Sequence, residues 1–133
     1  MEIQGSKAIF VGGASGMCRA TAERFKSRGG EIAILDLPSS AGAEVAASMD
    51  GQFYPCDVTD YINTDQMIAD AVGHMGGLHF VLNTAGGGNR AVGGAAQRTV
   101  KKDGTRHPTD VFSRVLDLNL VASFNINTAA AHH

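Results

Sequence analysis

The chain has 133 residues, of which 44% are hydrophobic and 18% charged, and its formal net charge is -2. A chain of this length can bury one core, and folded chains of this size hide roughly two-thirds of their surface. We therefore expect a single domain over residues 1–133. The charge gives no general attraction to nucleic acid or to an anionic membrane surface, and no apolar run approaches the ~20 residues of a membrane span.

Short apolar strands alternate with helices along almost the whole chain. Strands are predicted at residues 7–11, 31–35, 52–55 and 78–82. Helices are predicted at residues 16–28 and 41–49, from Asn63 or Thr64 to His74, and as one long helix capped by Thr109-Asp110. Strands without polar alternation, joined by helices, imply a parallel sheet covered on both faces. The expected fold is α/β, a three-layer Rossmann-type sheet that ends after its fourth strand and the following helix.

The first strand runs directly into a glycine-rich turn, Gly12-Gly13-Ala14-Ser15-Gly16. Gly12 lets the chain leave the strand through dihedrals that a Cβ would forbid, and Gly16 lets the backbone approach a pyrophosphate closely. The helix that follows presents unpaired N–H groups and the positive end of its dipole. The turn therefore predicts a site for the two phosphates of a dinucleotide.

Asp36 stands twenty residues after Gly16, at the end of the second strand. A carboxylate there can accept hydrogen bonds from both hydroxyls of an adenosine ribose and would repel a 2′-phosphate. The neighbouring positions Ala14, Ser15 and Leu37 carry no cation. We therefore predict NAD, rather than NADP, as the cofactor.

Segments further along the chain resemble a known family. Asp57-Val58 after the third strand, Asn83-Thr84-Ala85-Gly86 after the fourth, and Asn119 in the long helix match, in order and spacing, the marks of the short-chain dehydrogenase/reductases. The turn resembles that family's Gly-x-x-x-Gly-x-Gly loop. Residues 34–40, 100–104 and 112–120 are in addition similar to the type-II 3-hydroxyacyl-CoA dehydrogenases.

The resemblance implies an NAD site and one catalytic residue. Asn119 would belong to the family's proton relay. The positions that would line the pyrophosphate and its ribose are Gly12, Ser15, Gly16 and Met17, and Asp36 would bind the adenine ribose. The adenine edge would be held by Asp57 and Val58. The contacts from the end of the fourth strand would come from Asn83, Ala85 and Gly86.

The family's catalytic Ser, Tyr and Lys have no counterparts in this sequence. In the family the lysine stands four residues after the tyrosine, but Val58 and Asp65 occupy those positions after Tyr54 and Tyr61. The one serine after Asn119 is Ser123, which lies on the same predicted helix and not on a following strand. We therefore interpret the chain as the NAD-binding part of an oxidoreductase that moves a hydride between NAD and a secondary alcohol or ketone.

The substrate implied by the resemblance is a small molecule similar to a 3-hydroxyacyl-CoA. The alternatives are a non-catalytic nucleotide-binding or scaffold half-domain, and a remnant whose binding residues serve no activity. We expect no turnover from these 133 residues alone.

Two departures from the family pattern concern the turn. Cys18 occupies the place of the third glycine, where a thiol is either reactive at a helix N-terminus or a small buried apolar group. Val11 replaces a threonine whose hydroxyl would tie down the loop. The two cysteines, Cys18 and Cys56, match no metal-ligand spacing, and neither do the histidines, so no metal is expected. The absence of a disulfide framework and of a leader-like start predicts a cytoplasmic protein.

The remaining expectations concern partners. Five of the eleven basic residues lie between residues 87 and 106, where they either meet the phosphates of coenzyme A or form a solvated loop: Arg90, Arg98, Lys101, Lys102 and Arg106. The strand at residues 78–82 would be an uncovered edge beside an apolar helix, and such edges pair with another chain. Either the natural protein is longer, or the chain forms a homo-oligomer.

Overall fold

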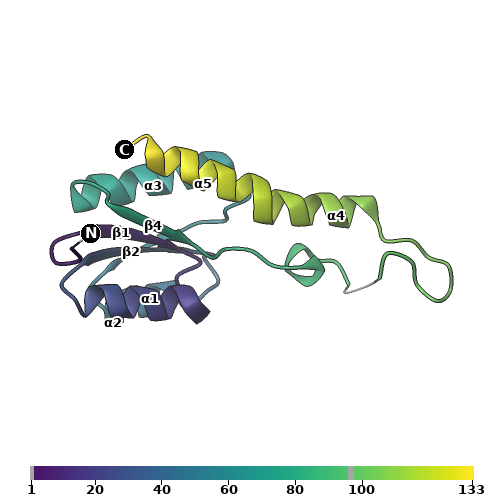
Figure 1. Ribbon diagram of the computed structural model, residues 1–133, viewed down its shortest axis with the longest axis horizontal. Coiled ribbons are helices and arrows are strands. Elements are labelled where there is room, and N and C mark those ends of the chain that lie inside the picture. Colours follow the sequence, from purple (N-terminus) through teal and green to yellow (C-terminus); the bar gives the residue numbers. More distant parts are fainter. Residues whose placement is uncertain (1, 96–97) are drawn as a thin grey trace.

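Four parallel strands form one sheet between two layers of helices (Figure 1). The computed structural model describes residues 2–95 and 98–133. The strand order is β3-β2-β1-β4, and the strands are β1 (Lys7–Val11), β2 (Glu31–Asp36), β3 (Gln52–Pro55) and β4 (Phe80–Asn83). The predicted α/β fold with a three-layer Rossmann-type sheet is confirmed.

Helices cover both faces of this sheet. Figure 1 shows α1 (Gly16–Lys26) and α2 (Gly42–Ser48) on one face and α3 (Tyr61–Met75) and α5 (Ala122–Ala131) on the other. The segment after β4 runs out beyond the sheet, through the short 3-10 helix η1 (Asn89–Val92), and returns through α4 (Thr109–Leu116). Figure 1 shows α4 beyond the end of the sheet at which the strands finish, in line with α5.

The core lies on both faces of the central strand β1. Ile9 and Val11 point into a cluster with α3 and α5, while Ala8 and Phe10 point into a cluster with α1. In the second cluster the rings of Phe10 and Phe25 meet edge to face, with centroids 5.7 Å apart. Such a pair adds about 0.5–1.5 kcal/mol beyond the area that it buries. All four β1 residues from Ala8 to Val11 are fully buried, as the run without polar alternation predicts.

Several predicted element boundaries were wrong. Helix α3 begins at Tyr61 and not at Asn63 or Thr64, because the Asp60 carboxylate caps it by accepting the Asn63 N–H at 3.0 Å. Thr64 is buried inside the first turn, where its hydroxyl donates to the Asp60 carbonyl at 2.8 Å.

Three further ends shift by a few residues. Helix α1 stops at Lys26, before residue 28, and the fourth strand spans residues 80–83 rather than 78–82. Thr109 and Asp110 are the first residues of α4 rather than its cap. That position belongs to Pro108, whose extended backbone leads into the helix.

The predicted long helix contains a wide turn. A π-helical segment, η2 (Asp117–Val121), joins α4 to α5. Within it, the side-chain amide of Asn119 donates to the Val115 carbonyl at 2.8 Å, so a side chain serves a carbonyl of the preceding turn. Single π turns often occur at functional sites. None of the described helices is long and apolar enough to cross a membrane.

Candidate functional site

A cavity of about 680 Å³ opens at the carboxyl ends of β1, β2 and β4. Its volume lies within the roughly 300–1,000 Å³ range of small-molecule sites. β1 is the strand from which the chain order runs outward in both directions, and such a switch point is where open α/β sheets bind ligands. Nine of the ten predicted cofactor-contacting residues line this one cavity, while Asn83 does not. Their contact with a cofactor stays a prediction.

The turn after β1 uses its two outer glycines differently. Gly12 has φ +78°, and a Cβ added to it would lie 2.8 Å from the Ala85 nitrogen, so the backbone after β4 packs directly on it. Gly16 has φ +58°, and an added Cβ would meet no described atom within 4 Å. Gly12 is thus required for packing, whereas Gly16 keeps space open beside the cavity.

The N-terminus of α1 is exposed to this space. Ser15 precedes the helix in an extended conformation, and within the described residues its hydroxyl makes no capping bond. Ser15, Gly16 and Met17 all line the cavity. Because the first N–H groups of a helix lack carbonyl partners within it, this end offers donors to an anion.

The Asp36 carboxylate binds the turn as well as lining the cavity. One oxygen accepts the Ala14 N–H at 2.8 Å, and the other accepts the Leu37 N–H at 2.8 Å. Sequence reasoning missed the first bond, which joins residues 22 positions apart. A carboxylate oxygen has two acceptor positions, so each can still accept a hydroxyl from a ligand.

The segment after β3 forms the next wall. One oxygen of Asp57 accepts both the N–H and the hydroxyl of Thr59, at 3.0 and 2.7 Å, which fixes the turn. Val58 is 7% exposed and lines the cavity beside Asp57. Thr59 also lines the cavity but was not predicted.

Asn83 supports the wall that Ala85 and Gly86 form. Its side-chain oxygen accepts the Ala85 N–H at 2.9 Å, and its nitrogen donates to the Ser123 hydroxyl at 3.0 Å. Asn83 therefore ties the segment after β4 to α5, behind the residues that line the cavity.

Asn119 holds the same segment from η2. Its nitrogen donates to the Gly87 carbonyl at 2.7 Å, and its oxygen accepts the Gly87 N–H at 3.0 Å. With the bond to Val115, both of its N–H donors are used. Asn119 is exposed at the edge of the site and lies outside the described lining.

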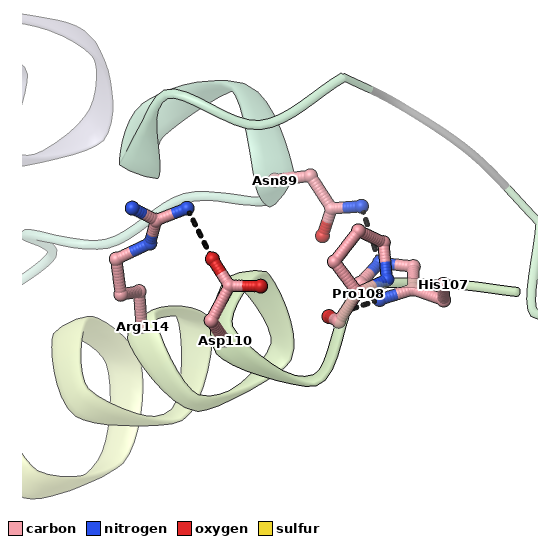
Figure 2. A network of polar contacts seen from close by, with 5 residues as sticks. All are labelled: Asn89, His107, Pro108, Asp110 and Arg114. Atoms are coloured by element: carbon pink, nitrogen blue, oxygen red, sulfur yellow. Dashed lines mark hydrogen bonds and ion pairs between the residues drawn. The ribbon is translucent and has the colours of Figure 1, made fainter.

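Helix α4 and η2 supply lining residues that sequence reasoning missed, among them Arg114 and Asp117. Figure 2 shows Arg114 paired with Asp110 one helical turn away, with a nitrogen to oxygen distance of 3.1 Å. This i, i+4 pair was visible in the sequence. Asp117 accepts a hydrogen bond from the Tyr61 hydroxyl, which raises the pKa of that tyrosine.

The loop before α4 is held by a histidine. The Asn89 amide lies 2.7 Å from Nε2 of His107, and Nδ1 of the same ring lies 2.9 Å from the Pro108 carbonyl (Figure 2). Asn89 belongs to η1, whose residues Ala91 and Val92 line the cavity. The network therefore connects the start of α4 to the cavity wall.

Both cysteines are buried. Cys18 is fully buried and its thiol donates to the Val11 carbonyl at 3.4 Å, while burial raises its pKa to about 11. This contradicts a reactive thiol and supports the interpretation as a small buried group. Cys56 lies 3.4 Å from the Thr64 hydroxyl, and burial also raises its pKa. Among the described residues, no three His, Cys, Asp or Glu side chains gather as metal ligands.

Comparison with known proteins agrees with this architecture. A family model described as enoyl-(acyl carrier protein) reductase matches residues 12–133. The 3-hydroxyacyl-CoA dehydrogenase type-2 of Homo sapiens is 36% identical over 127 residues, which cover 94% of this chain and 47% of that protein. Its namesake from Drosophila melanogaster is 33% identical over 126 residues, covering 93% of this chain and 48% of that protein.

A third relative carries a different activity in its name. The 15-hydroxyprostaglandin dehydrogenase [NAD(+)] of Homo sapiens is 33% identical over 96 residues, covering 67% of this chain and 36% of that protein. The chain thus spans about half the length, or less, of these relatives.

Proposed function

The chain belongs to the short-chain dehydrogenase/reductase family, and from that premise we propose that its cavity binds NAD as the cofactor-binding half of an oxidoreductase. Membership of this family implies that the chain binds a nicotinamide dinucleotide, NAD or NADP. The observation that carries the proposal is that the open Gly16 turn, the N-terminus of α1 and the Asp36 carboxylate line one cavity.

The residues present fit such a cofactor from end to end. The open space at Gly16 would admit the pyrophosphate against the N–H groups of α1, with the Ser15 hydroxyl as a further donor. The free acceptor positions of Asp36 suit two ribose hydroxyls, and Val58 offers an apolar surface to the adenine.

The preference for NAD over NADP rests on Asp36. Its carboxylate would repel a 2′-phosphate, and the residues that flank it in the cavity wall, Leu37 and the glycine-rich turn, carry no positive charge. The relative named 15-hydroxyprostaglandin dehydrogenase [NAD(+)] carries the same cofactor in its name.

Calorimetry with NAD and NADP tests this assignment. We expect NAD to bind at least tenfold more tightly than NADP, and Asp36→Asn to narrow that ratio. Asp70→Asn, which removes an exposed carboxylate on α3, is the matched control and leaves the ratio unchanged. Equal affinities for the two cofactors, or an unchanged ratio in Asp36→Asn, would refute the assignment.

The chemistry supplied by bound NAD is hydride transfer to or from a secondary alcohol carbon. In this chain Asn119 holds the backbone of Gly87 at the rim of the site. The similarity to 3-hydroxyacyl-CoA dehydrogenases supports an acyl-CoA-like substrate.

A non-catalytic nucleotide-binding module is the second candidate. The observation that favours it is that, among residues 2–95 and 98–133, neither tyrosine bonds a lysine: Tyr54 lies on β3, and the Tyr61 hydroxyl donates to Asp117. An assay of NADH oxidation with acetoacetyl-CoA tests whether these 133 residues are catalytic by themselves. We expect NAD binding without turnover from these 133 residues, and measurable turnover would contradict the interpretation as a cofactor-binding half.

We also propose that the basic loop contributes to an acyl-CoA site. Residues 100–106 form a small hairpin, closed by a bridge between Val100 and Arg106, in which Lys101 and Lys102 are exposed. The hairpin lies in the same excursion as the cavity-lining η1 (Figure 1).

Acetyl-CoA binding measured at low salt tests the contribution of the loop. Replacing Lys101 and Lys102 by Ala is expected to weaken binding about tenfold, since each lysine near a phosphate contributes electrostatic attraction. Replacing the exposed Arg24 and Arg28 of the α1 region by Ala removes the same charge and is expected to leave binding unchanged. If both double variants weaken acetyl-CoA binding equally, the attraction comes from the net charge of the chain and the proposed role of the loop is refuted.

A further inference from the structure

One histidine joins the start of α4 to the wall of the cavity. The ring of His107 lies between Asn89, the first residue of η1, and Pro108, the residue before α4 (Figure 2). Ala91 and Val92 of η1 line the cavity. The contacts of this ring therefore bear on where one wall of the cavity stands.

The hydrogen bonds around the ring determine where its proton lies. A carbonyl oxygen only accepts, so Nδ1 of His107, 2.9 Å from the Pro108 carbonyl, must carry a hydrogen. The Asn89 side-chain nitrogen donates to the Ala95 carbonyl at 3.2 Å, which fixes the orientation of that amide. Its second N–H is then the donor to Nε2 of His107, 2.7 Å away. Because Nε2 accepts, the ring is neutral in this arrangement.

Protonation of Nε2 is incompatible with this arrangement. Both ring nitrogens of an imidazolium are donors, so the Asn89 N–H would face a second donor. Rotating the amide would bring its oxygen to Nε2 but would also place its nitrogen away from the Ala95 carbonyl, so one of the two bonds is lost either way. Histidine ordinarily gains this proton between about pH 5 and 8. The contact between η1 and His107 is thus sensitive to acid.

The charged groups on the elements around the ring do not bind it. Within the described ranges, His107 forms no ion pair. Of the two carboxylates on these elements, that of Asp110 pairs with Arg114 at 3.1 Å, and that of Asp103 accepts a backbone N–H at 2.9 Å. The other charged residues of η1 and of the loop before α4 are all basic: Arg90, Arg98, Lys101, Lys102 and Arg106. A charged ring therefore has no ion pair here to offset the bond that it loses.

A change at Asn89 reaches the cavity through the backbone of η1. The two cavity-lining residues follow Asn89 within the same short helix, and the Asn89 carbonyl accepts the Gly94 N–H at 2.7 Å. Gly94 packs on the buried Val111 of α4, where an added Cβ would lie 2.6 Å from Val111 Cγ1. The bond to the histidine and the packing of Gly94 thus hold η1 against α4 together.

We propose that His107 is a positioning residue for the cavity. As a neutral ring it holds η1 against α4, and protonation of Nε2 releases η1 and weakens ligand binding in the cavity. His107 acts through Asn89 and lies outside the described lining. The effect on the ligand rests on the proposed binding of NAD, whereas the tautomer of the ring and the release of η1 do not.

Nuclear magnetic resonance of the ring and of η1 tests the part that needs no ligand. At about pH 8 we expect Nδ1 of His107 to carry the proton and Nε2 to carry none. As the pH falls to about 5.5, the backbone amide signals of Ala91 and Val92 should shift with the same midpoint as the ring. A ring protonated on Nε2 at the higher pH, or wall amides that do not follow its titration, overturns the proposal.

Calorimetric titration with NAD at the same two pH values tests the effect on the cavity. We expect NAD to bind about fivefold more weakly at the lower pH, which corresponds to about 1 kcal/mol. His107→Gln supplies an amide oxygen that can accept from Asn89 at both pH values, so it should bind NAD normally and lose the pH dependence. His107→Ala has no acceptor, so at the higher pH it should bind NAD as weakly as the unsubstituted chain does at the lower.

A second histidine provides the matched control. His74 is exposed in the last turn of α3, outside the described lining, and His74→Gln should keep the pH dependence. A pH dependence that survives His107→Gln, or one that His74→Gln also removes, overturns the assignment to His107. If NAD binds at neither pH value, the proposed cofactor function fails, and the ring and wall signals alone decide whether His107 positions η1.

Discussion

The two outer glycines of the turn make a paired prediction about stability and binding. In Gly12→Ala the new methyl would lie 2.8 Å from the Ala85 nitrogen, a backbone atom at the end of β4. Left-handed backbone costs a residue with a Cβ about 1–2 kcal/mol, and overpacking costs about 1–3 kcal/mol more. We expect Gly12→Ala to lower the free energy of unfolding by about 2–5 kcal/mol.

In Gly16→Ala the methyl would meet no described atom, so only the backbone cost of about 1–2 kcal/mol applies. The methyl would, however, occupy the space proposed for the pyrophosphate. NAD affinity should fall at least tenfold, which corresponds to about 1.4 kcal/mol.

Urea unfolding and calorimetric titration with NAD measure the two effects separately. Gly5→Ala is the matched control, because Gly5 also has a left-handed backbone with open space around it but lies far from the cavity, before β1. It should lose as much stability as Gly16→Ala and bind NAD normally. The reasoning fails if Gly16→Ala binds NAD as tightly as Gly5→Ala, or if Gly16→Ala is destabilised as strongly as Gly12→Ala.

Three further predictions concern groups around the cavity. Burial of Cys18 raises its pKa from 9.0 to about 11, so the folded state holds this proton more tightly than the unfolded state. The associated stability is complete below pH 9.0, falls as the pH rises towards about 11, and amounts to about 2–3 kcal/mol. Cys18→Ala should flatten that part of a urea-unfolding pH profile, and an unchanged profile would contradict the assignment to Cys18. Tyr61→Phe removes the hydroxyl bonded to Asp117 and should lower the melting temperature, whereas an unchanged value would mean that the bond contributes nothing to the fold. Asn119→Ala should cost about 1 kcal/mol and speed amide exchange at Gly87, because that N–H loses its acceptor; unchanged exchange would refute the positioning role.

The sequence predicted the sheet and most of the cavity wall because those features depend on local patterns. Uninterrupted apolar runs mark buried strands, and the carboxyl ends of parallel strands meet at one edge of a sheet. For that reason the glycine-rich turn, Asp36 and Asp57 could be placed together before their contacts were known. The predicted start of α3 at Asn63 or Thr64 was wrong, although the sequence carries the signal for the observed start, because Asp60 is a good cap and directly precedes the helix.

Other features depend on contacts that a pattern does not show. The π-helical segment η2 leaves the apolar pattern continuous. Its one sequence signal is that Phe112, Leu116, Leu120 and Phe124 recur every four residues, a longer step than the 3.6 residues of a regular turn. Arg114 and Asp117 line the cavity because the segment after β4 leaves the sheet and the chain returns to it through α4 and η2. The bond from Ala14 to Asp36 spans 22 positions and has no local signature.

That last bond constrains how the molecule can be redesigned. If the proposed site binds NAD, exchanging Asp36 for a basic residue is the obvious way to make it accept a 2′-phosphate, yet the exchange would also remove the acceptor of the Ala14 N–H. The acidic side chain braces the glycine-rich turn, in addition to the role in cofactor discrimination that we propose for it. A successful switch must therefore install a replacement acceptor for the Ala14 amide at the same time as the new positive charge.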